Sequence, residues 1–291
     1  MFFYWSDSNL CDQFLFIMNE RNRAEGWQHA KLSGHKNEDL VTALIMGDIK
    51  IQERLLKSAS KTGKIISVEE GGLCEKLIPS VLSGGTKAKP DMRLNLNTND
   101  HINVSLKKSL CGQVYLISIE RFVIGFEIQY NKKIPFEVKK AMSLFWGTAQ
   151  NIVQLTNQYA KVEIPYQIKK HRLVKDTMDR INPQLSIVLL EWFKTNIVEI
   201  FDFCFVRGLA KNKEDWADVI WYKNLLKGER DGDTMINLKE LKGKLQDNVD
   251  LVCYGTKTGG STIQLPFGFV QWHQGKMQFH HNLKVIKSLY Q

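Results

Sequence analysis

The sequence lacks any paired or clustered cysteine motif. Its five cysteines are far apart, and none forms a CxxC pair or the ligand spacing of a structural zinc site. We therefore expect reduced thiols, as is typical of a cytosolic protein. The apolar N-terminal residues 1–18 lack the basic start of a secretory signal and are interrupted by Asp7 and Asp12. We expect them to pack on the core of a cytoplasmic protein.

The sequence also lacks an uninterrupted apolar run of membrane-spanning length. The most hydrophobic stretch covers residues 185–206, and charged residues recur in it at helical spacing: Glu191, Lys194, Glu199 and Asp202. This pattern predicts one long amphipathic helix with a polar stripe and no membrane span. Asn182-Pro183 is typical of a helix start, and Arg207-Gly208 is typical of a helix end.

Acidic residues are in the minority, with 31 Asp and Glu against 40 Lys and Arg, which gives a net charge of +9. This surplus favours a polyanionic partner, either nucleic acid or an anionic membrane face. The hydrophobic fraction of 43% and the aromatic fraction of 10% are typical of a folded chain. A length of 291 residues fits one large domain or two small ones.

The order of expected elements indicates an α/β or α+β fold. A helix is expected from near Glu38 and a short strand at 64–68, and alternating runs at 92–97 and 102–107 predict a hairpin. We divide the chain into residues 1–165, a catalytic core, and residues 166–291, the long helix with a recognition region. A single continuous domain is the alternative.

Residues 89–109 carry the chemistry. A carboxylate at the start of one strand can meet the middle of its antiparallel neighbour, which would bring Asp91 close to Ser105, the Leu106 carbonyl and Lys107. Such oxygens can hold a hard divalent cation, and the lysine can position a nucleophile or stabilise negative charge. The alternative is that Asp91 is a turn residue and that Lys107 and Lys108 are exposed on an edge strand.

The Pro-Asp pair followed after a dozen or so residues by x-x-Lys resembles the PD-(D/E)xK nucleases. More closely, the chain resembles the type II restriction endonucleases of the HinP and MspI kind, in which Gln or Asn precedes the lysine by two positions. Five patches in the family's order, spanning about residues 34 to 286, carry this resemblance: GHKNEDL, LSGGTKAKPDMRL, HINVSLKKS, EWFKTNIVEIFDFCFVRG and KMQFHH.

The resemblance implies a mixed sheet flanked by helices and a C-terminal DNA-recognition region. It implies that Asp91 binds Mg²⁺, for which Mn²⁺ would substitute, that Lys107 is the catalytic lysine, and that Glu38 is the acidic residue of the N-terminal helix. Ser105 departs from the family pattern, because a hydroxyl is a poorer Mg²⁺ ligand than a carboxylate. It would bind through water, leave the metal to Asp91, the Leu106 carbonyl and the phosphate, or mark a weakened or inactive site.

Side chains that can read base edges or contact phosphates are concentrated near the C-terminus and around the expected site. Alternation in residues 276–281 directs Lys276, Gln278 and His280 to one face, while Met277 and Phe279 face the core. The expected DNA-binding residues are Gln278, Lys276, His273, Gln113, Arg207, Lys211, Lys87 and Lys89. An ordinary amphipathic strand and solvated basic loops are the alternatives.

The expected function is Mg²⁺-dependent cleavage of double-stranded DNA at a short palindrome, with a central CG or GC by analogy with the family. A separate methyltransferase would protect the host, and the protein would act as a monomer or a homodimer. The alternatives are another nuclease of the same fold, acting in repair, nicking or junction resolution, and a non-catalytic DNA-binding protein.

Overall fold

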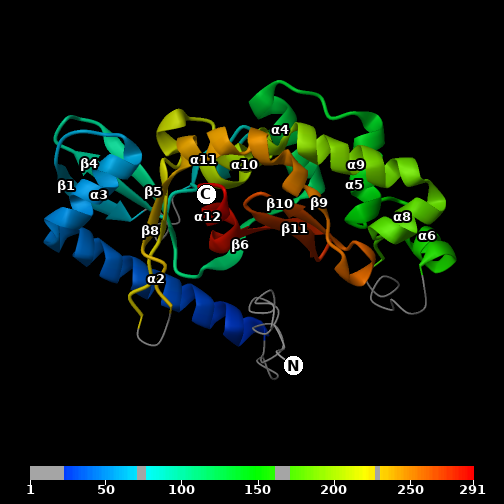
Figure 1. The fold of residues 1–291 in the computed structure, drawn as a ribbon, viewed down its shortest axis with the longest axis horizontal. Helices are drawn as coiled ribbons and strands as arrows, with labels where there is room; N and C mark the ends of the chain where they lie inside the picture. The colour runs from blue at the N-terminus through cyan, green and yellow to red at the C-terminus, as the bar shows by residue number, and fades with distance from the viewer. Residues whose placement is uncertain (1–22, 71–76, 161–170, 227–229) are drawn as a thin grey trace.

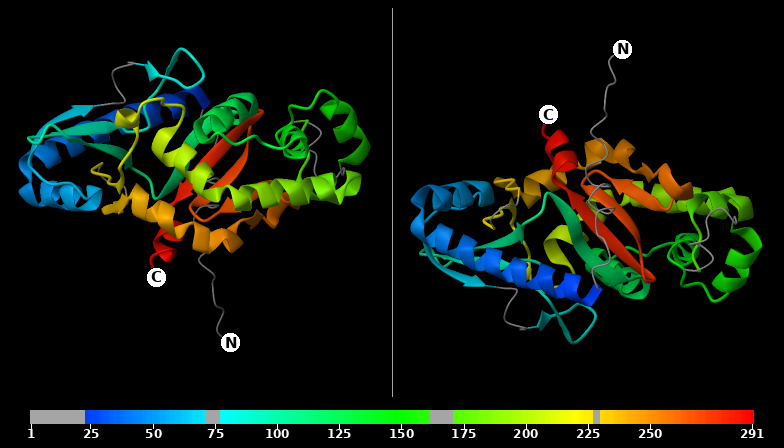
Figure 2. Two further views of the ribbon diagram at one scale, coloured as in Figure 1. Left: turned by 90° about the horizontal axis from the view of Figure 1, so that it is seen from above. Right: turned by 90° about the horizontal axis from the view of Figure 1, so that it is seen from below.

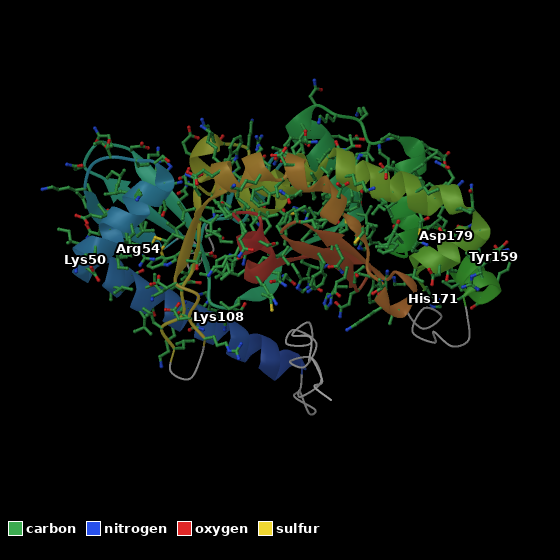
Figure 3. All side chains as sticks on the ribbon, viewed as in Figure 1. Lys50, Arg54, Lys108, Tyr159, His171 and Asp179 are labelled. Carbon is green, nitrogen blue, oxygen red and sulfur yellow. The ribbon has the colours of Figure 1, made fainter. Side chains whose placement is uncertain are left out.

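The computed structural model describes residues 23–70, 77–160, 171–226 and 230–291 (Figure 1). The expected packing of residues 1–18 on the core lies outside this part of the chain. The molecule is elongated, with Lys50 and Arg54 marking one end and Tyr159 and Asp179 the other (Figure 3). None of the helices in the described ranges has a stretch long and apolar enough to cross a membrane.

The first sheet is mixed and has five strands. In spatial order these are β1 (Ile65–Glu70), β4 (Met92–Leu96), β5 (His101–Lys107), β7 (Val219–Tyr222) and β8 (Thr234–Asn237). Neighbouring strands are antiparallel except β5 and β7, which are parallel. The predicted hairpin is β4 and β5, and Asn99 in its turn adopts a φ of +60°, a conformation that asparagine tolerates. The expected mixed α/β fold with helix-flanked sheets is confirmed.

Two helices cover one face of this sheet, α2 (Arg23–Gly47) and α3 (Ile49–Ala59) (Figures 1 and 2). Val41 and Ile45 of α2 pack with alternate buried residues of β4 and β5 in one hydrophobic cluster. The Asp48 carboxylate accepts from the first backbone NH groups of α3 and separates the two helices. The predicted helix start near Glu38 is wrong, because α2 begins at Arg23, and Glu38 therefore lies inside the helix.

The second sheet is antiparallel throughout and also has five strands. In spatial order these are β6 (Cys111–Ser118), β12 (Lys276–Asn282), β11 (Gly268–His273), β10 (Thr262–Leu265) and β9 (Cys253–Tyr254). Met277 and Phe279 are buried, and Lys276, Gln278 and His280 alternate with them, as the sequence predicts. One face of this sheet is therefore apolar, and the other presents polar side chains.

The predicted long helix begins where expected but is broken. The Asn182 side chain accepts a hydrogen bond from the Gln184 NH, and α9 (Pro183–Thr195) starts with Pro183. The helix stops at buried Asn196, whose side chain donates to the Trp192 carbonyl, and continues as α10 (Ile197–Phe201) and a π-helical segment, η2 (Asp202–Arg207). The single-helix expectation is wrong here, because the Asn196 backbone leaves the helical conformation, with φ −113° and ψ 21°.

The other elements surround these two sheets: α4 (Ile119–Tyr130), α5 (Phe136–Phe145), α6 (Ile152–Tyr159), α8 (Lys175–Ile181), α11 (Leu238–Lys244), α12 (Leu283–Ser288), β2 (Ile78–Pro79) and β3 (Gly85–Thr86). Three short 3-10 turns complete the described chain: η3 (Lys213–Asp215), η4 (Gln246–Leu251) and η5 (Lys257–Gly259). Strands β7 and β8 join the first sheet, while β6 joins the second. Both sheets therefore draw strands from both sides of residue 165.

Candidate active site

Asp91 lies directly before β4 and faces the end of β5. Its backbone NH donates to the Val104 carbonyl over 2.9 Å, which fixes its place at the edge of the hairpin. Its carboxylate accepts from the Leu106 NH at 2.7 Å and from the Ser105 hydroxyl at 3.3 Å. The Asp91 carboxylate therefore meets the far end of β5, whereas the sequence predicts the middle of the neighbouring strand.

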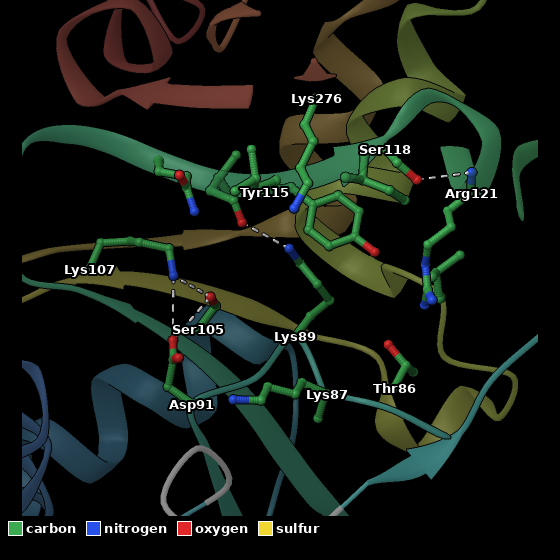
Figure 4. A pocket seen from close by; sticks show the side chains of 16 residues that line it. Thr86, Lys87, Lys89, Asp91, Ser105, Lys107, Tyr115, Ser118, Arg121 and Lys276 are labelled. Atoms are coloured by element: carbon green, nitrogen blue, oxygen red, sulfur yellow. Dashed lines mark hydrogen bonds and ion pairs between the residues drawn. The ribbon is translucent and has the colours of Figure 1, made fainter. Parts of the chain in front are cut away.

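The ammonium group of Lys107 lies among three oxygens of this cluster. It is 2.7 Å from the Ser105 hydroxyl and 3.4 Å from the Asp91 carboxylate (Figure 4). It is also 3.1 Å from the Leu106 carbonyl. Ser105 and Lys107 share the face of β5 opposite the buried residues Val104 and Leu106. The three oxygens expected to hold a metal therefore already converge on one positive charge.

These three oxygen donors fit a hard divalent cation that takes most of its ligands from water and the substrate phosphate. They are one carboxylate, one hydroxyl and one carbonyl, and Mg²⁺ characteristically takes one or two carboxylates plus waters and substrate phosphate. Within the described residues, no group of three or more histidine, cysteine, aspartate or glutamate side chains could hold a metal.

Glu38 lies on α2, and its carboxylate is 3.3 Å from the Nδ1 atom of His35. It does not line the cavity that contains Asp91 and Lys107. The structure therefore does not bring Glu38 together with the predicted cluster in that cavity.

A cavity of about 600 Å³ opens over the cluster, between the approach to β4 and strand β6 (Figure 4). Among the residues that the structure describes, its lining contains five basic side chains and a single carboxylate, that of Asp91. The basic residues are Lys87, Lys89, Lys107, Arg121 and Lys276. A cavity with this imbalance attracts anions. Lys107 is the expected catalytic lysine, Lys87, Lys89 and Lys276 are among the expected DNA-binding residues, and Arg121 was not predicted.

Lys89 is half-buried in the wall of the cavity. Its ammonium donates to the Val114 carbonyl at 3.0 Å and lies 4.0 Å from the centre of the Tyr115 ring. Burial lowers the pKa of Lys89 to about 7, since the charged form loses its water. Lys89 thus connects the approach to Asp91 with strand β6.

The polar face of the second sheet carries a chain of four side chains, which we call the glutamine chain: Gln113, Gln278, Gln271 and His280. The Gln278 amide donates to Gln113 at 2.7 Å, and the Gln271 amide lies 2.9 Å from Gln278 and 3.2 Å from the His280 ring. Burial lowers the pKa of His280 to about 4, so its neutral ring can accept from Gln271. The structure thus brings together Gln113 and Gln278, two of the expected DNA-binding residues, and places Gln271 beside them.

Three other expected DNA-binding residues lie outside the lining of the cavity. Arg207 forms an ion pair with buried Asp202, and its guanidinium lies 4.0 Å from the centre of the Trp216 ring. Lys211 is exposed, and its backbone NH donates to the Pro79 carbonyl. His273 pairs with Lys276 in the β11–β12 ladder, beside the glutamine chain.

Comparisons with known proteins find little at the level of sequence. No protein-family model matches the chain, and no curated protein matches it. Among solved structures, the chain is similar to the crystal structure of the restriction endonuclease MspI in complex with its cognate DNA. The sequence identity is 13%, the match covers 79% of this chain and 77% of that chain, and the TM-score is 0.43.

Proposed function

We propose that this chain is a type II restriction endonuclease that makes Mg²⁺-dependent double-strand cuts in DNA at a short palindromic site. The observation that carries the proposal is the convergence of the Asp91 carboxylate, the Ser105 hydroxyl and the Leu106 carbonyl on the Lys107 ammonium. This cluster lies in a cavity with five basic side chains, where a backbone phosphate would be attracted.

The chemistry follows from the positions of these groups. Mg²⁺, or Mn²⁺ in its place, would supply a lowered pKa for the attacking water and charge compensation for the phosphoryl oxygens. Asp91, the Leu106 carbonyl and, directly or through water, Ser105 would hold it. Lys107 would stay beside the same phosphate, position the water that attacks phosphorus and stabilise the developing negative charge.

The glutamine chain supports sequence-specific reading of DNA. Amide side chains pair with base edges in the major groove, and mutual hydrogen bonds between Gln113, Gln278 and Gln271 hold their amides in one orientation. Lys276, two residues before Gln278 on β12, lines the cavity that contains Asp91. Base reading and cleavage would therefore take place on adjoining surfaces, with Lys87, Lys89 and Lys211 as phosphate contacts.

A restriction enzyme requires a second enzyme that protects the DNA of its own cell. The host would need a separate methyltransferase of the same specificity, and both proteins would act in a prokaryotic cytoplasm. The protein would engage its palindrome as a monomer or as a homodimer with two equivalent centres.

A second candidate is a DNA-binding protein without activity, favoured by the neutral hydroxyl of Ser105 where a carboxylate or amide ligand is expected. Another nuclease of this kind, acting in repair, nicking or junction resolution, would use the same cluster without the sequence preference.

Digestion of unmethylated phage DNA by the purified protein separates these functions. The proposal predicts discrete fragments in Mg²⁺ and none in EDTA, and sequencing of their ends would give the site and the overhang. A uniform smear or random nicks would favour another nuclease of the same kind. DNA retention in a mobility-shift gel without cleavage in Mg²⁺ or Mn²⁺ would favour the non-catalytic protein.

A further inference from the structure

The cavity over Asp91 extends well beyond the predicted catalytic cluster. At the end away from Lys107 it is lined by Arg121 of α4 and by Thr86 of β3, with Lys276 of β12 on a further wall (Figure 4). The Ser118 hydroxyl accepts from the Arg121 backbone NH at 3.4 Å, which places Arg121 in the first turn of α4. Nothing in the predicted chemistry at Asp91 uses Arg121 or Thr86.

The basic side chains of this cavity fall into two groups. Lys107 lies against Asp91, and Lys89 donates to the Val114 carbonyl. Lys87, Arg121 and Lys276 have no carboxylate partner among the residues that the structure describes. Like charges that line one cavity disfavour each other, and an anion between them removes that cost.

Arginine at this position favours one kind of anion. A guanidinium is a planar fork of donors that matches two oxygens of a phosphate. A hydroxyl such as that of Thr86 can donate to a further phosphate oxygen. A cavity of about 600 Å³ is large enough to hold more than one phosphate group.

We propose that Arg121 binds a second backbone phosphate, next to the scissile phosphate on the same DNA strand, with Thr86 as an additional donor. The proposal rests on the proposed nuclease function, because the first phosphate is placed at Asp91 and Lys107. Arg121 is then a positioning residue, which sets where the strand lies relative to the cluster. It acts through the backbone and not through the bases.

Single methylphosphonate groups test this contact, since each removes one backbone charge from a defined duplex containing the site. The wild-type protein is expected to lose about tenfold in single-turnover cleavage when the neutral group is next to the scissile phosphate. Arg121→Gln is expected to cleave the unmodified duplex more slowly by a similar factor. A methylphosphonate next to the scissile phosphate should not slow this variant any further. Arg121→Lys should recover part of the rate, because it restores the charge without the fork.

The matched control is Arg180→Gln on α8, an arginine outside the cavity with the same change in charge. It should behave as the wild-type protein at every position of the methylphosphonate. The proposal would be overturned if the methylphosphonate slowed cleavage by Arg121→Gln as much as it slows cleavage by the wild-type protein, at the position next to the scissile phosphate and at every other position.

A second measurement keeps the test separate from the nuclease function. If the wild-type protein cleaves no DNA, the proposed function fails, and duplex binding in EDTA is then measured against salt concentration. Loss of one phosphate contact should lower the slope of log affinity against log salt by about 1 in Arg121→Gln and leave it unchanged in Arg180→Gln. An unchanged slope in Arg121→Gln would contradict the phosphate contact.

Discussion

The Lys107 ammonium donates a hydrogen bond of 2.7 Å to the hydroxyl of Ser105, two residues earlier on the same face of β5. The only carboxylate within reach of that ammonium is Asp91, at 3.4 Å, among the residues that the structure describes. The cluster therefore compensates a cation with a single negative charge and two neutral oxygens. If the proposed Mg²⁺ binds here, residue 105 is therefore the position at which a second charged ligand could be added.

Ser105→Asp is expected to strengthen metal binding. A second carboxylate beside Asp91 adds the charge that a hard divalent cation prefers, so the Mg²⁺ concentration for half-maximal cleavage should fall by about tenfold. Ser105→Ala, which removes the oxygen, should raise it. The measurement is a Mg²⁺ titration of the cleavage rate of one defined duplex. The same half-maximal concentration in all three proteins would show that residue 105 does not contribute to the metal site.

Gln278→Ala is expected to reduce sequence discrimination. Gln278 joins Gln113 to Gln271, so its loss removes one base-reading amide and frees the other two. Affinity for the cognate duplex should fall by about 1–3 kcal/mol, while affinity for an unrelated duplex stays the same. Fluorescence anisotropy in Ca²⁺ measures both affinities. Gln246→Ala, at an exposed position of η4, is the control. Equal losses on both duplexes would indicate a contact to the backbone.

Asp202→Asn is expected to destabilise the fold without changing the chemistry. The Asp202 side chain is 5% exposed, and its carboxylate accepts from Tyr130 and Lys242 at 2.8 Å each and pairs with Arg207. Removal of its charge leaves two cations without their buried partner, at a cost of about 3–5 kcal/mol. Urea unfolding measures this cost, and Asp250→Asn at an exposed position is the control. An unchanged free energy of unfolding would contradict a structural role for Asp202.

The protein is expected to lose stability in mild acid. Burial lowers the pKa of His281 to about 3, whereas the unfolded chain leaves it near 6.5. Between these values the unfolded state binds the proton and the folded state does not, so the free energy of unfolding falls as the pH decreases. The contribution of His281 at about pH 5 is about 2 kcal/mol.

His281→Gln isolates this contribution, because glutamine retains an acceptor near the Tyr222 hydroxyl, which lies 3.1 Å from the histidine ring. The free energy of unfolding, measured in urea at neutral pH and at about pH 5, should decrease less in the variant than in the wild-type protein, by about 2 kcal/mol. An identical pH dependence in both proteins would exclude His281 as the source.

Local patterns in the sequence are sufficient to predict the hairpin that builds the proposed site. Strict alternation in residues 92–97 and 102–107 sets both the strands and the faces, so the pattern alone assigns Ser105 and Lys107 to one side of the sheet. The N-cap at Asn182 is equally local. Helix α2 has no such signal at its start, since residues 23–37 lack a regular apolar stripe.

Long-range pairing and burial of charge could not be predicted in the same way. Strand β6 pairs with β12, more than 150 residues later, and this pairing brings Gln113 within hydrogen-bond distance of Gln278. Asp202 was expected on an exposed stripe and is buried, because Lys242, Tyr130 and Arg207 arrive from distant or irregular segments to compensate it. The basic side chains that line the cavity likewise come from segments far apart in the sequence, such as those of Lys87 and Lys276.

The central claim is that Asp91 and Lys107 form a DNA-cleaving centre, and single-turnover cleavage of unmethylated DNA in Mg²⁺ tests it most directly. Asp91→Asn keeps the size of the side chain and removes its charge, and it should lower the rate by about a thousandfold or more while DNA binding in Ca²⁺ persists. Asp100→Asn, in the hairpin turn beside Lys61, is the matched control and should cleave as the wild-type protein does. Full activity of Asp91→Asn would contradict the account.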